Sequence, residues 1–239
     1  KIDFSQWGKI EEKPLTKIQK ITGDRLQKAW QTIPHVTQFD EANISILNAK
    51  REEFKKEGLK KNIRVTFLPF IIKAIIRTLK DFPVFNSSLD HLSEKLVVKN
   101  YYNIGIAIDT PSGLIVPVIK NADNKSVLGV SKELMDLSER ARSGKLKPED
   151  LKGGSFTISS LGGIGGSHFT PIINPPEVAI MGISKSQWKP IYDNKNKEII
   201  PTCTMPISLS YDHRVIDGAI GASFISFFLE AVLDSSTFS

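Results

Sequence analysis

The stretch SLSYDHRVIDGA, residues 208–219, ends a run of apolar and small residues in Asp212, His213 and Arg214, and it places a second acid, Asp217, directly before a glycine. A histidine at a strand end is usually structural. This one lies between two charged residues, and burying such a cluster is costly unless every member is paired. Proteins often retain such clusters for chemistry. On these residues alone, His213 is open to both a structural and a functional interpretation.

Periodic patterns around this stretch predict alternating helices and strands. The predicted helices cover residues 15–30, 44–57, 66–81, 126–142 and 217–233, with a short helical turn at 148–151. The predicted strands cover residues 35–39, 156–160, 177–186 and 197–212, and β-rich runs within 95–120 suggest a hairpin or meander. Interleaved elements without a repeat predict one α/β domain over residues 1–239, with a mixed sheet and flanking helices.

Composition excludes several classes of protein. Of the 239 residues, 40% are hydrophobic and 24% are charged, which is ordinary for a globular domain. The most apolar segment, residues 66–79, is interrupted by Lys73 and Arg77, so it predicts a buried helix and no membrane span. A single cysteine, Cys203, excludes an internal disulfide, which fits a reducing compartment. Because the chain begins with Lys and its first methionine is Met135, we expect it to be part of a longer protein.

The positive charge is concentrated in KREEFKKEGLKKNIR, residues 50–64. The net charge of the chain is +6 and its isoelectric point is about 9.2. Glutamates interrupt the basic run, and Phe54 is its only aromatic residue. This pattern favours a solvated helix face over a nucleic-acid-binding surface. An anionic ligand or surface is the alternative.

Other motifs fail the tests for common sites. The loop LGGIGGS, residues 161–167, fits neither a P-loop nor G-x-G-x-x-G. It therefore predicts a turn, with close approach of the backbone to a ligand or a neighbouring chain as the alternative. Ser159 and Ser160 lack the G-x-S-x-G setting of a serine nucleophile, so Ser159 taken alone is interpreted as structural. Cys203 is interpreted as a buried, inert thiol.

The remaining histidines favour structural or surface positions. They are His35, His91 and His168. They do not provide the i, i+4 pair of an H-E-x-x-H zinc site, so we predict no metal site.

Three segments together resemble one enzyme family. They are SYDHRVIDG at 210–218, the run from FTISSLGGIGG to FTPIINPPEVAIMGISKS at 156–186, and DTPSGLIVPVI at 109–119. Their combination resembles the catalytic domain of dihydrolipoamide acyltransferases, the core components of 2-oxo acid dehydrogenase complexes. FTISSLGGIGG and IPHVTQFDEA at 33–42 are similar to the bacterial acetyltransferases of pyruvate dehydrogenase complexes. The resemblance implies the chloramphenicol-acetyltransferase-like fold of coenzyme-A-dependent acyltransferases.

The resemblance also implies a reaction, in which an acetyl group moves between the thiol of coenzyme A and a dihydrolipoyl thiol carried by a separate lipoyl domain. His213 matches the general base, which is needed because a thiol of pKa near 8.5 is only about 3% ionised at pH 7. Ser159 matches the donor to the oxyanion, which replaces its structural interpretation. Asp217 matches a supporting acid that pairs with a basic side chain, or it caps the last helix. We expect Asp212 and Arg214 to form ion pairs that organise the loop.

Partners are expected on the same basis. The family forms homotrimers with the active site at the subunit boundary, and the trimers assemble into a hollow cube or dodecahedron, with the cube expected for a proteobacterial protein. Lipoyl and peripheral-subunit-binding domains would precede this domain, and the pyruvate dehydrogenase and dihydrolipoamide dehydrogenase components would bind through them. We expect a bacterial cytoplasmic protein without nucleic-acid or membrane partners. The chain end, LEAVLDSSTFS, differs from the family's aliphatic docking run, so the cage size is left open.

Two alternatives remain. One is another acyltransferase of the same fold, with a branched-chain or succinyl donor or with a free small-molecule acceptor. The other is a protein whose main role is to organise partner enzymes as a structural core. The presence of Ser159, His213 and Asp217 favours an enzyme over a purely structural role.

Overall fold

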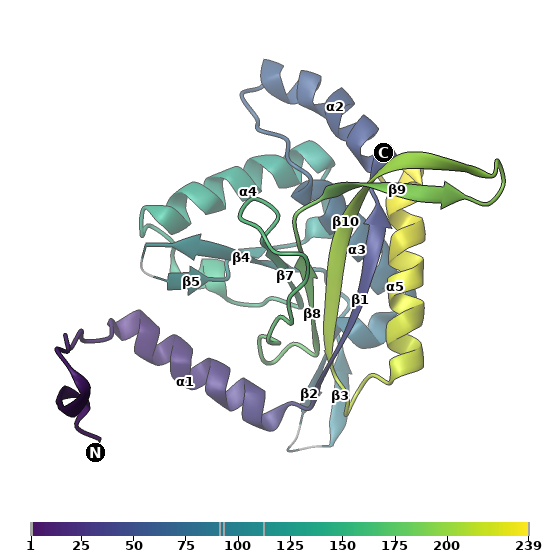
Figure 1. Ribbon diagram of the computed structural model, residues 1–239. Coiled ribbons are helices and arrows are strands. Elements are labelled where there is room, and N and C mark those ends of the chain that lie inside the picture. Colours follow the sequence, from purple (N-terminus) through teal and green to yellow (C-terminus); the bar gives the residue numbers. More distant parts are fainter. Residues whose placement is uncertain (1, 91, 93, 112, 239) are drawn as a thin grey trace.

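The computed structural model (Figure 1) describes residues 2–90, 92, 94–111 and 113–238. Its helices are α1 (Lys17–Thr32), α2 (Ser45–Lys60), α3 (Leu68–Asp81), α4 (Val127–Arg142) and α5 (Gly218–Leu233). Its strands are β1 (His35–Asn43), β2 (Ser87–Asp90), β3 (Lys95–Val98), β4 (Ile104–Thr110), β5 (Gly113–Ile115), β6 (Val118–Ile119), β7 (Phe156–Ser160), β8 (Ala179–Ile183), β9 (Gln187–Asp193) and β10 (Glu198–Asp212). Short 3-10 turns are η1 (Phe4–Trp7), η2 (Pro83–Asn86), η3 (Ala122–Asn124), η4 (Pro148–Leu151) and η5 (Ser235–Phe238).

One mixed sheet organises the molecule, in the order β1-β10-β8-β7-β4-β5, with β6 beside β4 and β9 beside β10. β7 runs parallel to both β4 and β8, and the other pairs in this sheet are antiparallel. Parallel neighbours need a crossover connection, and the one from β4 to β7 contains α4. The predicted α/β class with a mixed sheet and flanking helices is confirmed.

The main core lies between the sheet and the layer formed by α3, α4 and α5. Helix α3 buries most of its length, including Phe70 and Ile72, against these neighbours, which confirms the predicted buried helix. Its two interrupting charges have partners at the edge of the core. Lys73 Nζ donates to the carbonyls of Asp123 and Lys125, and Arg77 Nη1 donates to Asp234 and to Thr237.

The opposite face of the sheet has a thinner cover. A small cluster of Ala29, Ile33, Ile173 and Ile180 packs the end of α1 onto this face. From this cluster α1 extends toward β5, where Ile18 lies close to Gly113, and the β9–β10 hairpin extends beyond the opposite side of the sheet (Figure 1). Helix α1 and this hairpin expose large apolar side chains, among them Trp30 at 59%, Trp188 at 70% and Ile199 at 68%. Exposed apolar surface of this kind commonly marks contacts with other chains.

The basic run forms the exposed part of α2, as predicted. Three of its lysines pair with glutamates one helical turn away, in the pairs Lys50–Glu53, Lys55–Glu52 and Lys61–Glu57. No helix in the described part of the chain combines the length and the apolar character of a membrane span.

The β-rich runs within 95–120 were predicted to form a hairpin or a meander, and the hairpin is the alternative that is confirmed. Strand β4 pairs locally with β5 and β6, whereas β3 pairs with β2 in a separate two-stranded sheet. Strands β2 and β9 were not predicted.

Candidate active site

His213 follows β10 on a turn whose backbone is fixed from several directions. The His213 N–H donates to the Pro34 carbonyl at 3.0 Å, and the preceding Asp212 N–H donates to the Val178 carbonyl at 2.9 Å. Ile216, which is fully buried, anchors the far side of the turn in the core. The imidazole is exposed. The turn therefore presents a polar ring at a defined place on the surface.

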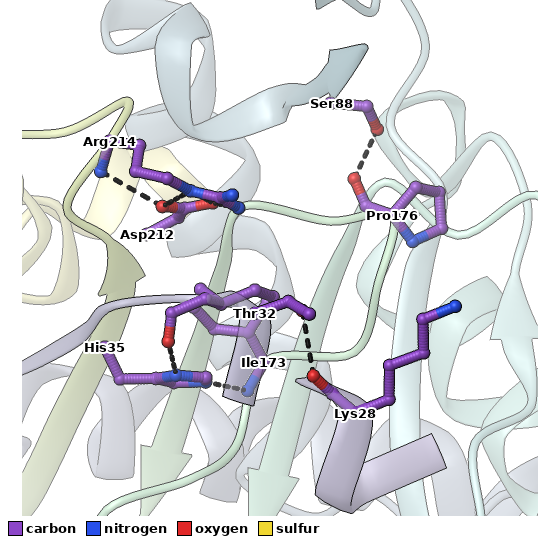
Figure 2. Close-up of polar contacts among 9 residues, drawn as sticks. Lys28, Thr32, His35, Ser88, Ile173, Pro176, Asp212 and Arg214 are labelled. Carbon is purple, nitrogen blue, oxygen red and sulfur yellow. Dashed lines mark hydrogen bonds and ion pairs between the residues drawn. The ribbon is translucent and has the colours of Figure 1, made fainter. Parts of the chain in front are cut away.

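Asp212 and Arg214 form the predicted ion pair (Figure 2). Arg214 donates from Nη2 to Asp212 Oδ2 at 2.6 Å and from Nε to Oδ1 at 2.9 Å, and its backbone N–H donates to Oδ1 as well. Asp212 is 2% exposed, so the guanidinium compensates a charge that would otherwise be buried alone. The pair closes the turn around His213, because its two members lie on either side of that residue.

Asp217 caps helix α5, as one of its two interpretations predicted. Its Oδ1 accepts from the Ile220 N–H at 2.9 Å. Gln38 Nε2 donates to the Gly218 carbonyl at 2.9 Å and ties the same helix start to β1. In the part of the chain that the structure describes, no basic side chain forms an ion pair with Asp217. Within one chain, the interaction of the Asp217 side chain is therefore the cap of α5.

Ser159 lies on β7 with its side chain on the thinly covered face of the sheet. Phe156 and Ile158 belong to the main core, so the alternation of a strand points Thr157 and Ser159 to the other side. Ser159 is half-buried. Its position is compatible with hydrogen bonding to a ligand on that face.

The structure does not bring Ser159 and His213 of one chain together. Ser159 is level with Gly182 on β8, and Gly182 is level with Ser208 on β10. Asp212 lies four residues further along β10, which corresponds to ~13 Å of strand rise. Because β8 lies between β7 and β10, the two residues are also separated sideways by two strand spacings of ~4.8 Å each. The hydroxyl and the imidazole therefore belong to different ends of the sheet.

The glycine-rich loop brings an aromatic ring beside Ser159. A Cβ at Gly182 would lie 2.7 Å from Cζ of Phe169, so the ring packs directly on that glycine. The loop itself is a largely exposed turn in which Gly166 has a φ of +85°, a backbone angle that favours glycine. The turn interpretation is confirmed, and the alternative of a neighbouring chain stays a prediction.

His35 and His168 have structural or exposed positions, as predicted. His35 donates from Nδ1 to the Ile33 carbonyl at 2.8 Å and accepts at Nε2 from the Ile173 N–H at 3.0 Å (Figure 2), so both ring nitrogens are used. His168 is exposed and packs edge-on against Phe39. His91 lies outside the described residues.

Burial raises the pKa of the Cys203 thiol, which keeps it protonated. No cluster of metal-ligand side chains occurs within the described ranges.

Sequence reasoning missed Glu177, which lies in the PPEV segment before β8. It is 4% exposed, and burial raises the pKa of its carboxyl group to about 7. A glutamate after two prolines resembles a surface turn, so the sequence carried no signal of burial.

The chain matches the profile of the family described as 2-oxoacid dehydrogenases acyltransferase (catalytic domain) over residues 8–238. The dihydrolipoyllysine-residue acetyltransferase component of the pyruvate dehydrogenase complex of Cupriavidus necator is 54% identical over 234 residues, which are 98% of this chain and 42% of that protein. The corresponding component of Haemophilus influenzae is 50% identical over 236 residues, which are 98% and 41% of the two chains. This chain thus spans less than half the length of these two relatives.

Solved structures agree. Dihydrolipoamide acetyltransferase of Azotobacter vinelandii, in a study of the role of a serine, a histidine and an asparagine in its catalytic mechanism, has a TM-score of 0.96 and 46% identity, with 100% of this chain and 97% of that one covered. The cubic core of a pyruvate dehydrogenase multienzyme complex has a TM-score of 0.96 and 45% identity at the same coverage. A chloramphenicol acetyltransferase has a TM-score of 0.54 and 12% identity over 90% of this chain and 94% of that one, which shows a shared fold.

Proposed function

This chain belongs to the 2-oxoacid dehydrogenase acyltransferase family, and we propose that it transfers an acetyl group between coenzyme A and a dihydrolipoyl group. The observation that carries the proposal is the exposed imidazole of His213 on a turn held by Pro34, Val178 and the Asp212–Arg214 pair. A positioned neutral imidazole is the group that a thiol needs to lose its proton near neutral pH. The names of the relatives, which are acetyltransferases, support acetyl as the transferred group.

In the proposed reaction, His213 accepts the proton of one thiol while the sulfur of that thiol attacks the carbonyl carbon of the acetyl thioester. The C–S bond that forms and the C=O π bond that opens give a tetrahedral oxyanion. When the oxyanion collapses, the second sulfur leaves and takes the proton from His213. No net charge is created, and the same steps run in both directions. No acyl-enzyme is required, which agrees with the absence of a G-x-S-x-G motif.

Ser159 is proposed to donate a hydrogen bond to the oxyanion. Its hydroxyl lies on a strand in the interior of the sheet, between β4 and β8, and such a rigid element holds a donor in place without reorganisation during the reaction. Loss of one oxyanion donor costs about 3–4 kcal/mol in other enzymes.

Asp217 is proposed to support the turn mainly as a helix cap. In the Azotobacter enzyme, the histidine and the asparagine under study are four residues apart, as are His213 and Asp217 here. Asparagine caps a helix about as well as aspartate does but has no charge. Capping is therefore the role that aspartate and asparagine can both fill at this position, which favours it over an ion pair.

The active site is proposed to lie between two chains of a homotrimer. One chain holds its Ser159 and His213 too far apart for one reaction, so each site would take the serine of one subunit and the histidine of another. The exposed apolar side chains of α1 and of the β9–β10 hairpin support contacts between chains.

Assembly beyond the trimer is proposed from the likeness to a cubic core. We propose that the domain forms the core of a pyruvate dehydrogenase complex. Its substrate arm would be a lipoyl domain of the longer chain, and the dehydrogenase components would bind through domains that precede this one. A bacterial cytoplasmic location stays a prediction. Branched-chain and succinyl donors are the alternatives, and a panel of acyl-coenzyme A substrates would reveal them as a preference over acetyl.

The function is tested by measuring acetyl transfer from acetyl-coenzyme A to dihydrolipoamide with the wild-type chain and with His213→Ala. The wild type should transfer acetyl groups, and the variant should lose about 10²–10⁴-fold in kcat with little change in the KM for acetyl-coenzyme A. Circular dichroism and particle mass should be unchanged. Near-normal turnover in the variant would remove His213 from the reaction.

A further inference from the structure

Glu177 is a buried acid that the reaction above does not use. Its Oε2 is buried without a hydrogen-bond partner among the described residues, and its Oε1 receives only a long contact of 3.5 Å from Asn174 Nδ2. Buried carboxyl oxygens are usually hydrogen-bonded. The site is also shaped for this side chain, because a Cβ at Gly154 would lie 2.8 Å from Oε1.

The backbone around Glu177 supports the His213 turn. Val178, the next residue, accepts the Asp212 N–H at 2.9 Å, directly before His213. On the other side, the Glu177 N–H donates to the Asn174 carbonyl at 3.1 Å, and Ser88 Oγ donates to the Pro176 carbonyl (Figure 2). A shift of Glu177 would therefore move the carbonyl that positions the base.

The side chain of Glu177 also contacts the strand of Ser159. Thr157 lies two residues before Ser159 on β7, with its side chain on the same face of the sheet. The Thr157 hydroxyl is buried, and its interaction with Glu177 lowers the pKa of the carboxyl group. One carboxyl group thus lies between the elements that carry Ser159 and His213.

The charges that face Glu177 come from two elements. Lys99, at the end of β3, is 8% exposed and donates from Nζ to the Ser87 carbonyl. Asp212 and Arg214 line the same cavity of about 150 Å³ as Glu177. Burial raises the pKa of Glu177 to about 7 and lowers that of Lys99, and the attraction between the two opposes both shifts. The charge of this cluster therefore changes near neutral pH.

We propose that Glu177 is a positioning residue, whose buried carboxyl group braces the segment before β8 against both the His213 turn and the Ser159 strand. The proposal rests on the function proposed above, because these positions matter only if both residues act in the reaction. Glu177 acts through Val178 and Thr157 and does not touch the reacting atoms. If each chain contributes to two sites, the Glu177 carboxyl group of that chain supports the histidine of one site and the serine of another.

The ionised form should brace more tightly. The contacts from Thr157, Lys99 and Asn174 all lower the pKa of Glu177, so all three bind the charged carboxylate better than the neutral acid. Glu177→Gln keeps the shape of the neutral acid and cannot ionise. Its kcat should match that of the wild type at low pH and fall behind as the pH rises and the wild-type group ionises.

The test measures kcat and KM for acetyl transfer from pH 5.5 to 9 in the full trimer, with Glu177→Gln, Glu177→Ala and the exposed control Glu149→Gln. The kcat ratio of Glu177→Gln to wild type should be close to one at pH 6 and should drop at least about threefold by pH 8.5. Glu177→Ala should lose about tenfold or more in kcat at every pH, with KM nearly unchanged, because misplacement by ~1 Å can cost ~10²-fold.

A ratio that is flat across this range, like that of the control, would overturn the proposal, and so would an effect confined to KM. If Glu177→Ala does not fold, the pH dependence of the Glu177→Gln ratio decides alone. A wild-type protein without acetyl transfer would instead refute the proposed function.

Discussion

At the scale of single residues, Ser159 and Ser160 are neighbours on β7 with opposite orientations. Ser159 shares the thinly covered face with Thr157, whereas Ser160 Oγ lies beneath the loop, 3.8 Å from the place of a Cβ at Gly162. Ser159→Ala should lower kcat by about 10²–10³-fold with a small effect on KM, and Ser160→Ala should stay within about twofold of wild type. Steady-state kinetics of the two variants check this. A larger loss in Ser160→Ala would mean that the other hydroxyl faces the site.

The ring of Phe169 restricts the space next to Ser159, because it packs on Gly182 in the adjacent strand. Phe169→Ala should admit longer acyl chains. Butyryl has two more methylenes than acetyl, and two methylenes at about 0.8 kcal/mol each correspond to roughly tenfold in kcat/KM. The measurement is the ratio of kcat/KM for butyryl- and acetyl-coenzyme A in wild type and variant. An unchanged ratio would place the acyl group elsewhere.

Glu177 should make the stability of the fold depend on pH. The folded-state pKa is raised from 4.5 to about 7, so the folded protein holds the proton more tightly than the unfolded chain. The resulting stabilisation is complete below pH 4.5 and is lost as the pH rises through 7, by up to about 3 kcal/mol. Glu177→Gln lacks this loss, so its unfolding free energy relative to wild type should rise from pH 5 to pH 8. Urea titrations at fixed protein concentration measure it; a constant difference would contradict the raised pKa.

At the scale of elements, local patterns predicted what local chemistry decides. The buried helix α3 and the Asp217 cap of α5 both follow from neighbouring residues. Strand β9 was not predicted because it contains Pro190 and exposes both faces, which removes the alternation of apolar and polar residues that marks a strand. The pairing of β4 with β7 joins distant segments, and sequence periodicity carries no information about partners.

The candidate site, like the fold, was predictable only in part. The motif around His213 and Ser159 identified both residues through the family resemblance. Their separation follows only from the order and register of β7, β8 and β10. Glu177 was missed because its burial depends on Gly154 and Thr157, which lie far from it in sequence.

The last turn, η5, closes the core at the end of α5. Phe238 is 1% exposed and packs edge-on against Phe70 with a centroid distance of 5.3 Å. Phe238→Ala should lower the free energy of unfolding by about 3–5 kcal/mol, as for other buried phenylalanines. Leu92→Ala, at a side chain that is 99% exposed, is the control and should change it by less than about 0.5 kcal/mol. Equal urea midpoints for both variants would show that this turn contributes little.

At the scale of the whole molecule, the separation of Ser159 and His213 would leave a single chain with an incomplete site if both residues act in the proposed reaction. The register of the sheet holds the two residues apart, and α1 and the β9–β10 hairpin (Figure 1) expose apolar side chains that another chain could cover. Folding and catalysis would then both depend on assembly, because each subunit boundary would supply the missing partner residue.

The most direct measurement of this claim is acetyl transfer by trimers that contain two different inactive chains. His213→Ala and Ser159→Ala chains are unfolded, mixed in equal amounts and refolded together, so that subunits combine at random. A site between two chains is intact when one chain supplies its histidine and the other its serine, which random assembly gives in about one quarter of sites. If the site is shared between chains, the mixture should recover about a quarter of wild-type activity, while each variant refolded alone stays near its own low value. A mixture that shows only the average of its two parents would mean that each site is built within one chain, and it would refute the shared site.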